Sequence, residues 1–380
     1  MSTRLKTLAH LVIDQSDQGE LPYLALEHLV GGTGALEPQA ELPIHTGGEQ
    51  GSSAVRPGDV LFGKLRPYLA KTFLISEPAY ASTELMALRP ASSMESRYLA
   101  YLVGSRPLID WATASSEGTR MPRTSWEKLG AFRVETVPTL KHQRAIADYL
   151  DTETTRIDAL ITKKLRIVEL VHELGERKEE QIALAVQSAK RIPVSFLFRI
   201  TKGINAQRLT AEYCAAHQGE YPVYSGQTSG VFGSIDEFDF AIPNGAIVVS
   251  TVGARVMSQA LVRGKFSLSQ NCLVMIPQQP EELVLELFVP QLRQLFDRLR
   301  SQIPDHMQPS LRVEDLRGKW LSVPSLNNQA KAALEIAALN EKVLEVRRKL
   351  SSQIDLLREY RQALITAAVT GEFEVPGVAA

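Results

Sequence analysis

A strand-like segment that ends in basic residues occurs twice in this chain of 380 residues. The first copy, residues 58–71, reads GDVLFGKLRPYLAK, and the second, residues 245–258, reads GAIVVSTVGARVMS. Their first residues are 187 positions apart (245 − 58), and Pro90 and Pro277, which close a second pair of matching segments, have the same separation. A period this long predicts two copies of a whole domain, because solenoid units repeat every 20 to 50 residues or so.

Each copy is followed by a long segment without proline, residues 139–190 and 325–372. A helix of that length spans about 70 Å at 1.5 Å per residue, whereas a domain of about 140 residues is only some 30 Å across. Because apolar residues recur every seven positions, we expect the two helices to pack against each other, antiparallel, as a coiled coil. The predicted coiled-coil residues are Ile157, Leu160, Ile167, Val171, Leu174, Ile336, Val343, Val346, Leu350, Leu357, Tyr360 and Leu364.

These patterns predict an α+β fold with two tandem, pseudo-two-fold-related α/β domains. Two long helices that form an antiparallel coiled coil separate the domains. The predicted boundaries are 1–138 for the first domain, 139–190 for the first helix, 191–324 for the second domain, 325–372 for the second helix and 373–380 for a tail.

Composition narrows the functional classes. The formal net charge is −1, so affinity for a polyanion has to come from local basic clusters. Cys214 and Cys272 are the only cysteines, which indicates a reducing cytoplasm and gives no ligand set for a structural metal. Because no apolar run reaches the roughly 18 residues of a membrane helix, we expect a cytoplasmic protein without a membrane partner.

Polar corners between the expected strands carry side chains that suit double-stranded DNA. Arg and Lys pair with guanine edges, Asn and Gln pair with adenine, and Glu accepts from cytosine. Thr83 and Glu84 in the first copy match Gln270 and Asn271 in the second, so we expect the two copies to read different bases. The candidate DNA-binding residues are Lys64, Arg66, Lys71, Thr83, Glu84, Arg120, Arg123, Arg255, Gln270, Asn271, His306, Gln308 and Arg312.

At the level of longer motifs, the chain resembles the specificity subunit of a type I restriction–modification system. Residues 357–377, LREYRQALITAAVTGEFEVPG, are similar to the end of the second long helix in such subunits, and residues 58–71 and 118–164 are similar to the family's first recognition domain and its junction into the first helix. The departure lies at residues 169–190, where the arginine-rich ending expected of the first helix is degraded.

This resemblance implies a non-catalytic subunit whose two target-recognition domains bind a bipartite double-stranded DNA site. It also implies partners: two methyltransferase subunits that methylate adenine with S-adenosylmethionine, and restriction subunits that use ATP and magnesium. No cofactor is expected in this chain itself. No recognition residue can be transferred from the family one to one, so the candidate residues above rest on their position in the corners.

Catalytic motifs are not found in the sequence. It contains no G-x-x-x-x-G-K-[ST] segment for nucleotide phosphates, and its glycine-rich stretches do not open a helix after a strand. One alternative is a coiled-coil scaffold that holds two protein-binding domains without touching DNA, and a second is a fragment of an endonuclease–methyltransferase fusion, which the mass of the native complex would reveal. Salt dependence separates DNA binding from the scaffold interpretation, because phosphate contacts make log K fall linearly with log salt.

Overall fold

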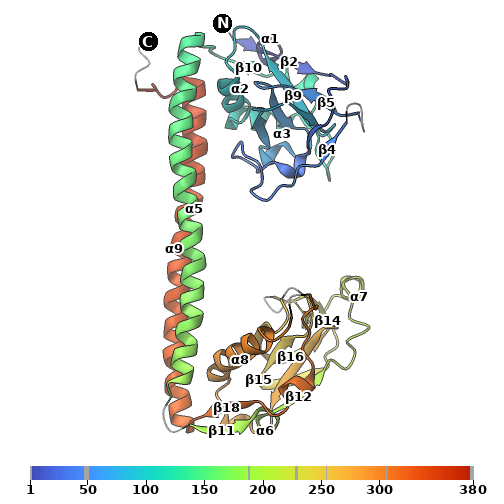
Figure 1. Cartoon of the computed structure of the whole chain (residues 1–380), viewed down its shortest axis with the longest axis vertical. Helices are drawn as coiled ribbons and strands as arrows, with labels where there is room; N and C mark the ends of the chain where they lie inside the picture. The colour runs from blue at the N-terminus through green and yellow to red at the C-terminus, as the bar shows by residue number, and fades with distance from the viewer. Residues whose placement is uncertain are drawn as a thin grey trace. The chain divides into compact units, whose positions relative to one another are not determined.

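The computed structural model describes residues 2–46, 51–186, 189–226, 230–253, 255–304 and 306–376. The chain divides into two compact units (Figure 1). The first unit comprises Met1–Leu165 and Ser351–Ala380, and the second comprises Arg166–Leu350. Each unit therefore contains part of each long helix.

The described residues of the first unit form two four-stranded sheets, with strand orders β2-β9-β6-β7 and β4-β3-β8-β5, and a two-stranded pair, β1-β10. All four residues of β6 are buried, because the strand lies in the interior of its sheet with both faces covered. The elements are β1 Thr3–Arg4, α1 Leu5–Leu8, β2 Ala9–Val12, β3 Leu21–Leu24, η1 Leu26–His28, β4 Ile44–His45, β5 Ser53–Val55, β6 Val60–Gly63, η3 Pro67–Leu69, β7 Thr72–Leu74, β8 Ala79–Ala81, β9 Leu85–Pro90, α2 Ser96–Val103, α3 Arg106–Ala114, α4 Trp126–Leu129 and β10 Arg133–Val134.

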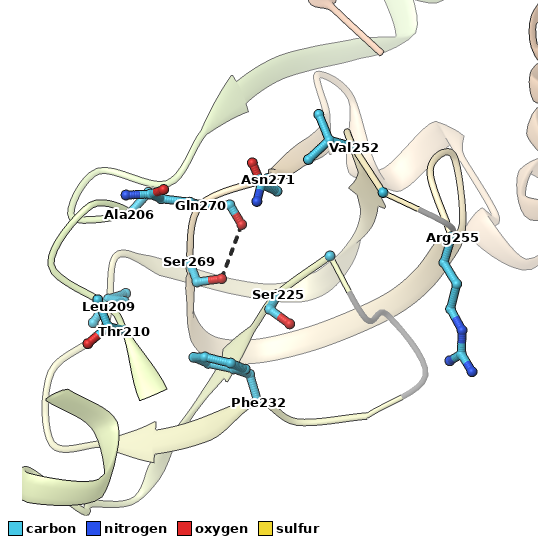
Figure 2. Close-up of a pocket in the computed structure, with 12 residues that line it drawn as sticks. Ala206, Leu209, Thr210, Ser225, Phe232, Val252, Arg255, Ser269, Gln270 and Asn271 are labelled. Atoms are coloured by element: carbon cyan, nitrogen blue, oxygen red, sulfur yellow. Dashed lines mark hydrogen bonds between the residues drawn. The ribbon is translucent and has the colours of Figure 1, made fainter. Parts of the chain in front are cut away.

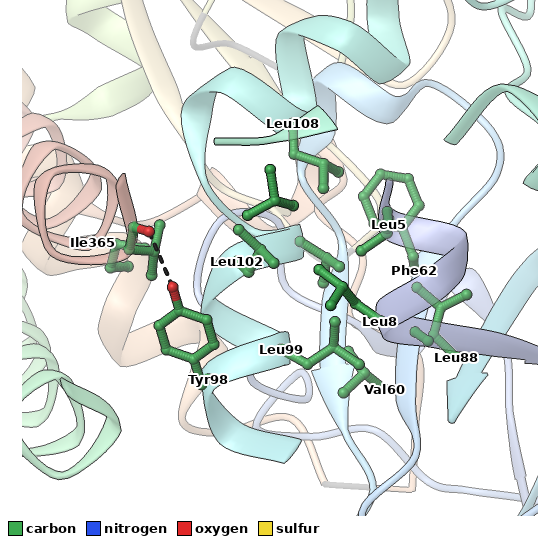
Figure 3. Close-up of a cluster of buried hydrophobic side chains, with 14 of the residues drawn as sticks. Leu5, Leu8, Val60, Phe62, Leu88, Tyr98, Leu99, Leu102, Leu108 and Ile365 are labelled. Atoms are coloured by element: carbon green, nitrogen blue, oxygen red, sulfur yellow. Dashed lines mark hydrogen bonds between the residues drawn. The ribbon is translucent and has the colours of Figure 1, made fainter. Parts of the chain in front are cut away.

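The core of this unit includes the ends of both long helices. Helix α2 places Tyr98, Leu99 and Leu102 on its buried face, at the helical spacing of three to four residues. The Tyr98 hydroxyl donates to the Val369 carbonyl of the second long helix at 3.0 Å, and Ile365 of that helix joins the same cluster (Figure 3). The helix ends are thus part of the domain core.

In the second unit, the strands of the described segments form one six-stranded sheet, β12-β17-β15-β16-β13-β14, and a two-stranded pair, β11-β18. Its elements are β11 Lys190–Pro193, α6 Val194–Leu197, β12 Phe198–Lys202, α7 Ala211–Ala216, β13 Tyr221–Tyr224, β14 Gly233–Ile235, β15 Phe240–Ser250, β16 Gln259–Leu268, β17 Cys272–Pro277, η4 Pro280–Glu282, α8 Leu285–Arg300, η5 Val313–Leu316 and β18 Trp320–Val323.

Strand pairing confirms the repeat. In the first unit β6 pairs antiparallel with β9, with Val60 opposite Leu88. In the second unit β15 pairs antiparallel with β17, with Ile247 opposite Met275. Both residues of the second pair follow those of the first by 187 positions, so the central strands of the two sheets keep one register.

The long helices are α5, Leu140–Leu184, and α9, Leu326–Thr370, of 45 residues each. Helix α5 ends before the predicted residue 190, because the chain enters β11 at Lys190. Residues 187 and 188 of the predicted first helix and 377–380 of the predicted tail lie outside the described residues.

The two helices pack antiparallel in each unit, which confirms the predicted fold class. In the first unit Arg361 pairs with Asp158 at 3.0 Å, and Lys164 donates to Gln353 at 2.7 Å. In the second unit the Val343 side chain packs closely against Gly175. A Cβ atom added at Gly175 would lie 3.0 Å from Cγ2 of Val343. Within the first unit, a contact further along α5 therefore involves a residue earlier in α9, as antiparallel packing requires.

The seam between the helices differs in part from the prediction. Ile157, Ile336 and Leu364 are buried, and Val171, Val343, Leu350 and Leu357 are half-buried. Leu160, Ile167, Leu174, Val346 and Tyr360 are exposed by 41–61%, so their assignment to the seam is wrong.

The error has a geometric cause in α9. Ile354, Arg361 and Ala368, which follow Leu350, Leu357 and Leu364 by four residues, are buried, whereas the predicted Tyr360 follows Leu357 by three residues and is exposed. In a helix of 3.6 residues per turn, the third and the fourth following residue lie on opposite sides of the first. Which of these two residues is buried depends on the surface that packs against α9.

Candidate nucleic-acid interface

Three chain segments meet at a polar corner of the first unit, formed by residues 64–66, 83–84 and 122–124. The backbone N–H of Lys64 donates to the Glu84 carbonyl at 2.9 Å, and the N–H of Thr124 donates to the Lys64 carbonyl at 3.0 Å. Leu65 and Arg123 form an isolated β-bridge. These bonds fix the backbone of what we call the first corner.

The second unit repeats this arrangement in residues 251–252, 269–271 and 310–312, the second corner. The N–H of Thr251 donates to the Asn271 carbonyl at 2.8 Å, and the N–H of Leu311 donates to the Thr251 carbonyl at 2.8 Å. Val252 and Ser310 form the β-bridge. Every partner follows its counterpart in the first corner by 187 positions, so the backbone frame is the same while the side chains differ.

The side chains of the first corner are engaged with one another. Arg123 donates through Nη2 to both carboxylate oxygens of Glu84, at 2.7 and 2.8 Å. The Lys64 ammonium donates to the Thr83 carbonyl at 2.6 Å, and the Lys71 ammonium donates to the Leu26 carbonyl at 2.9 Å. The structure therefore brings Lys64, Thr83, Glu84 and Arg123 together.

Electrostatics at Lys64 follow from this packing. Partial burial lowers the pKa of Lys64, the Glu84 carboxylate raises it, and the Arg123 guanidinium lowers it further. Desolvation disfavours the charged form of the ammonium, because the protein replaces part of the water around it. The hydrogen bond to the Thr83 carbonyl takes the place of one of these water contacts.

Two other predicted arginines of the first unit are exposed. Arg66 has a left-handed backbone with φ of 48°, a conformation that is uncommon for residues other than glycine and is enriched at functional sites. Arg120 follows Gly118, whose φ of +94° bends the loop before the third segment of the corner. Neither arginine belongs to the Glu84–Arg123 pair.

The amide side chains of the second corner are exposed to solvent. Gln270 and Asn271 are exposed, and Asn271 has a φ of 69°, which asparagine adopts more readily than most residues. Both line a pocket of about 570 Å³ together with Arg255, which comes from a separate loop (Figure 2). They also line a larger cleft of about 1060 Å³ that includes Arg312. His306 and Gln308 are exposed but belong to neither lining.

The cleft contains residues that the sequence interpretation missed. Lys202 at the end of β12, Asn205 and Arg208 line it. Asn205 donates through Nδ2 to Asp239 at 2.7 Å, and Arg208 forms an ion pair with Glu237. Their signal is the segment KGINAQR, residues 202–208, in which basic and amide residues follow a strand and a glycine.

Both cysteines of the second unit are buried. Burial raises the pKa of the Cys272 thiol to about 12 and raises that of Cys214 as well, so neither thiol is an activated nucleophile. Within the described part of the chain, no three His, Cys, Asp or Glu side chains cluster as metal ligands would. No helix there is long and apolar enough to span a membrane.

A family model and several solved structures match this chain. Residues 197–355 match the family of the type I restriction modification DNA specificity domain. A chain from a structural study of complex assembly and conformational transition of the type I R-M system is similar over 98% of both chains, with a TM-score of 0.70 and 16% identity. No curated protein matches the chain.

Two further solved structures are similar over nearly the whole chain. The HsdS subunit from Thermoanaerobacter tengcongensis has 16% identity and a TM-score of 0.49 over 98% of this chain and 97% of its own. The S subunit of a type I restriction–modification system from M. genitalium has 14% identity and a TM-score of 0.43 over 97% and 95%.

The two units with their shared strand register, and the two long helices, define the fold class, which the solved structure with a TM-score of 0.70 shares. Residues 197–355, which lie mostly in the second unit, match the type I restriction modification DNA specificity domain.

Proposed function

We propose that each unit reads one half of a bipartite double-stranded DNA site, and that the chain brings methyltransferase and restriction subunits to this site without catalysing a reaction itself. The observation that carries the proposal is the repeated corner. Lys64, Glu84 and Thr124 share the backbone hydrogen bonding of Thr251, Asn271 and Leu311. Two domains that recognise different DNA sequences can share one backbone structure, provided that the side chains that contact the bases differ.

The catalytic cofactors would then belong to the partner subunits. S-adenosylmethionine, ATP and magnesium are assigned to the methyltransferase and restriction subunits, and none to this chain. The buried state of both cysteines supports a role without nucleophilic catalysis in this chain. The test is an assay of the pure chain with these cofactors, and turnover by the chain alone would contradict the proposal.

The scaffold alternative makes a different prediction for binding. Phosphate contacts release counterions, so the binding constant for a DNA duplex should fall linearly with salt on logarithmic axes. We expect the complete chain to bind duplex DNA with that dependence and to select one bipartite sequence from a random library. A protein-binding scaffold would show neither behaviour.

Separate reading by the two units is tested at the second corner. Replacing Gln270 and Asn271 by alanine should relax recognition in one half-site only, by about 1–3 kcal/mol for each bidentate amide–adenine pair that the substitution removes. The matched control is Gln302→Ala, which removes an exposed amide outside both corners. Equal relaxation in both half-sites would count against separate readers.

A further inference from the structure

Glu84 and Arg123 form an outward-facing pair with hydrogen-bonding capacity to spare. The Arg123 side chain is 54% exposed and the Glu84 side chain 34% exposed. Both bonds between them use Arg123 Nη2, and no hydrogen bond from Nη1 or Nε is found among the described residues. The guanidinium therefore keeps donors for a ligand while the carboxylate limits its motion.

The backbone holds both members of this pair in place. The Glu84 carbonyl accepts from the Lys64 N–H, and Arg123 is bridged to Leu65. Thr124, the next residue, is 2% exposed, and its backbone N–H donates to the Lys64 carbonyl. A side chain that is positioned before binding loses less conformational freedom when it contacts a ligand.

The second corner has different side chains at the same two positions. Asn271 stands where the first corner has Glu84, and Ser310 stands where it has Arg123. The charged pair is thus replaced by an exposed amide, with Gln270 beside it. The two corners differ in the chemistry that they offer to a base edge, although their backbones match.

We infer that the first corner reads a G·C base pair through Glu84 and Arg123, and that the second corner reads the adenine of an A·T pair through Gln270 or Asn271. This inference rests on the proposed function. Arginine donates to guanine O6 and N7, and glutamate accepts from cytosine N4, so both members of the first pair select the same base pair. Amide side chains donate to N7 and accept from N6 of adenine.

Exchange of the side chains tests the assignment. Thr83→Gln, Glu84→Asn and Arg123→Ser together give these three positions of the first corner the residues of the second. In a selection from random duplexes with the complete chain, we expect one G·C position of the bipartite site to change to A·T, with about tenfold or greater discrimination. The other half-site should keep its sequence.

Two further variants separate specificity from charge. Arg123→Lys keeps the charge but loses the planar fork, so it should weaken the preference for G·C at that position while overall affinity stays close to wild type. Arg120→Gln removes an exposed charge beside the corner, and it should lower affinity for all sequences without changing the preferred bases.

The outcomes distinguish this inference from the proposed function. If wild type selects a bipartite site and the folded exchange variant selects the same site, or changes a position that was not G·C, the assignment is wrong while DNA reading stands. If wild type selects no sequence at all, both fail. Thermal unfolding of each variant checks its fold, and Arg123→Lys provides the decision if the exchange variant does not fold.

Discussion

Gln143 in α5 and Gln329 in α9 occupy equivalent places in the two units and make the same set of hydrogen bonds. Each amide oxygen accepts from one backbone N–H, and each amide nitrogen donates to two backbone carbonyls, at 2.8–3.0 Å. The partners are Glu95 N, Ser93 O and Pro138 O for Gln143, and Val284 N, Glu282 O and Pro324 O for Gln329. Both side chains are buried, so each amide ties a helix start to its domain.

Replacing either glutamine by leucine should destabilise its own unit. The substitution leaves three backbone groups without their partner, and we expect the free energy of unfolding to fall by about 2–4 kcal/mol. Denaturant unfolding of Gln329→Leu measures the loss, and Asn327→Ala, at an exposed position in the same turn of α9, serves as the control. A loss below about 0.5 kcal/mol would show that the amide network does not stabilise the junction.

Arg361 should be the most sensitive charged residue of α9. Its side chain is 8% exposed, donates to the carbonyls of Gly32 and Thr33 at 2.8 Å each, and pairs with Asp158. Arg361→Met leaves these acceptors unpaired, so we expect a loss of about 2–4 kcal/mol in the free energy of unfolding.

The matched control for Arg361 is Arg358→Met. Arg358 lies one turn away on the same helix and pairs with Asp355, but both side chains are at least 60% exposed. An exposed ion pair contributes little, so this variant should lose less than about 0.5 kcal/mol. Similar losses for the two variants in chemical denaturation would contradict the structural role assigned to Arg361.

The long helices are predicted to set the spacer between the two half-sites. The chain passes from one unit to the other within α5, after Leu165, and returns within α9, after Leu350. Inserting seven residues after Lys164 and seven after Leu350 should lengthen the helices by about 10 Å. At about 3.4 Å per base pair, the preferred spacer should grow by roughly three base pairs.

Site selection with the lengthened protein checks this prediction. The half-site sequences should not change, because neither corner is altered. Weaker binding is compatible with the prediction, since the inserted length also changes which face of the duplex each unit meets. Tight binding with the original spacer would show that the helices do not set the spacing.

Alkaline pH should destabilise the second unit through Cys272. Burial raises the pKa of this thiol to about 12 from the usual value of 9.0, so the unfolded chain releases the proton first. The stabilisation is fully present below about pH 9 and is lost towards pH 12, at about 1.4 kcal/mol per pH unit.

Cys272→Ala isolates this effect. The variant loses packing at every pH, but it lacks the thiol that titrates. The difference in unfolding free energy between wild type and variant should therefore shrink between pH 8 and pH 10.5. An unchanged difference across that range would mean that Cys272 ionises in the folded protein as readily as in the unfolded chain.

The repeat and the long helices follow from the amino-acid sequence alone. Constant spacing between Gly58 and Gly245 and between Pro90 and Pro277 predicted two copies of one domain, and the pairs β6·β9 and β15·β17 share one register at that spacing. Long proline-free segments predicted α5 and α9. These features obey local rules, because backbone geometry and apolar periodicity act within one segment.

Which side chains meet depends on the tertiary structure. The burial of Ile354 and Arg361 in place of the predicted seam residues depends on the surface that α9 faces, and nothing in the heptad pattern specifies it. The pairing of Glu84 with Arg123 joins residues 39 positions apart, and the network around Gln329 reaches back 47 positions to Glu282. Such contacts depend on how distant segments pack, because a side chain's free energy is set by its neighbours in space, whereas periodicity reports only its neighbours along the chain.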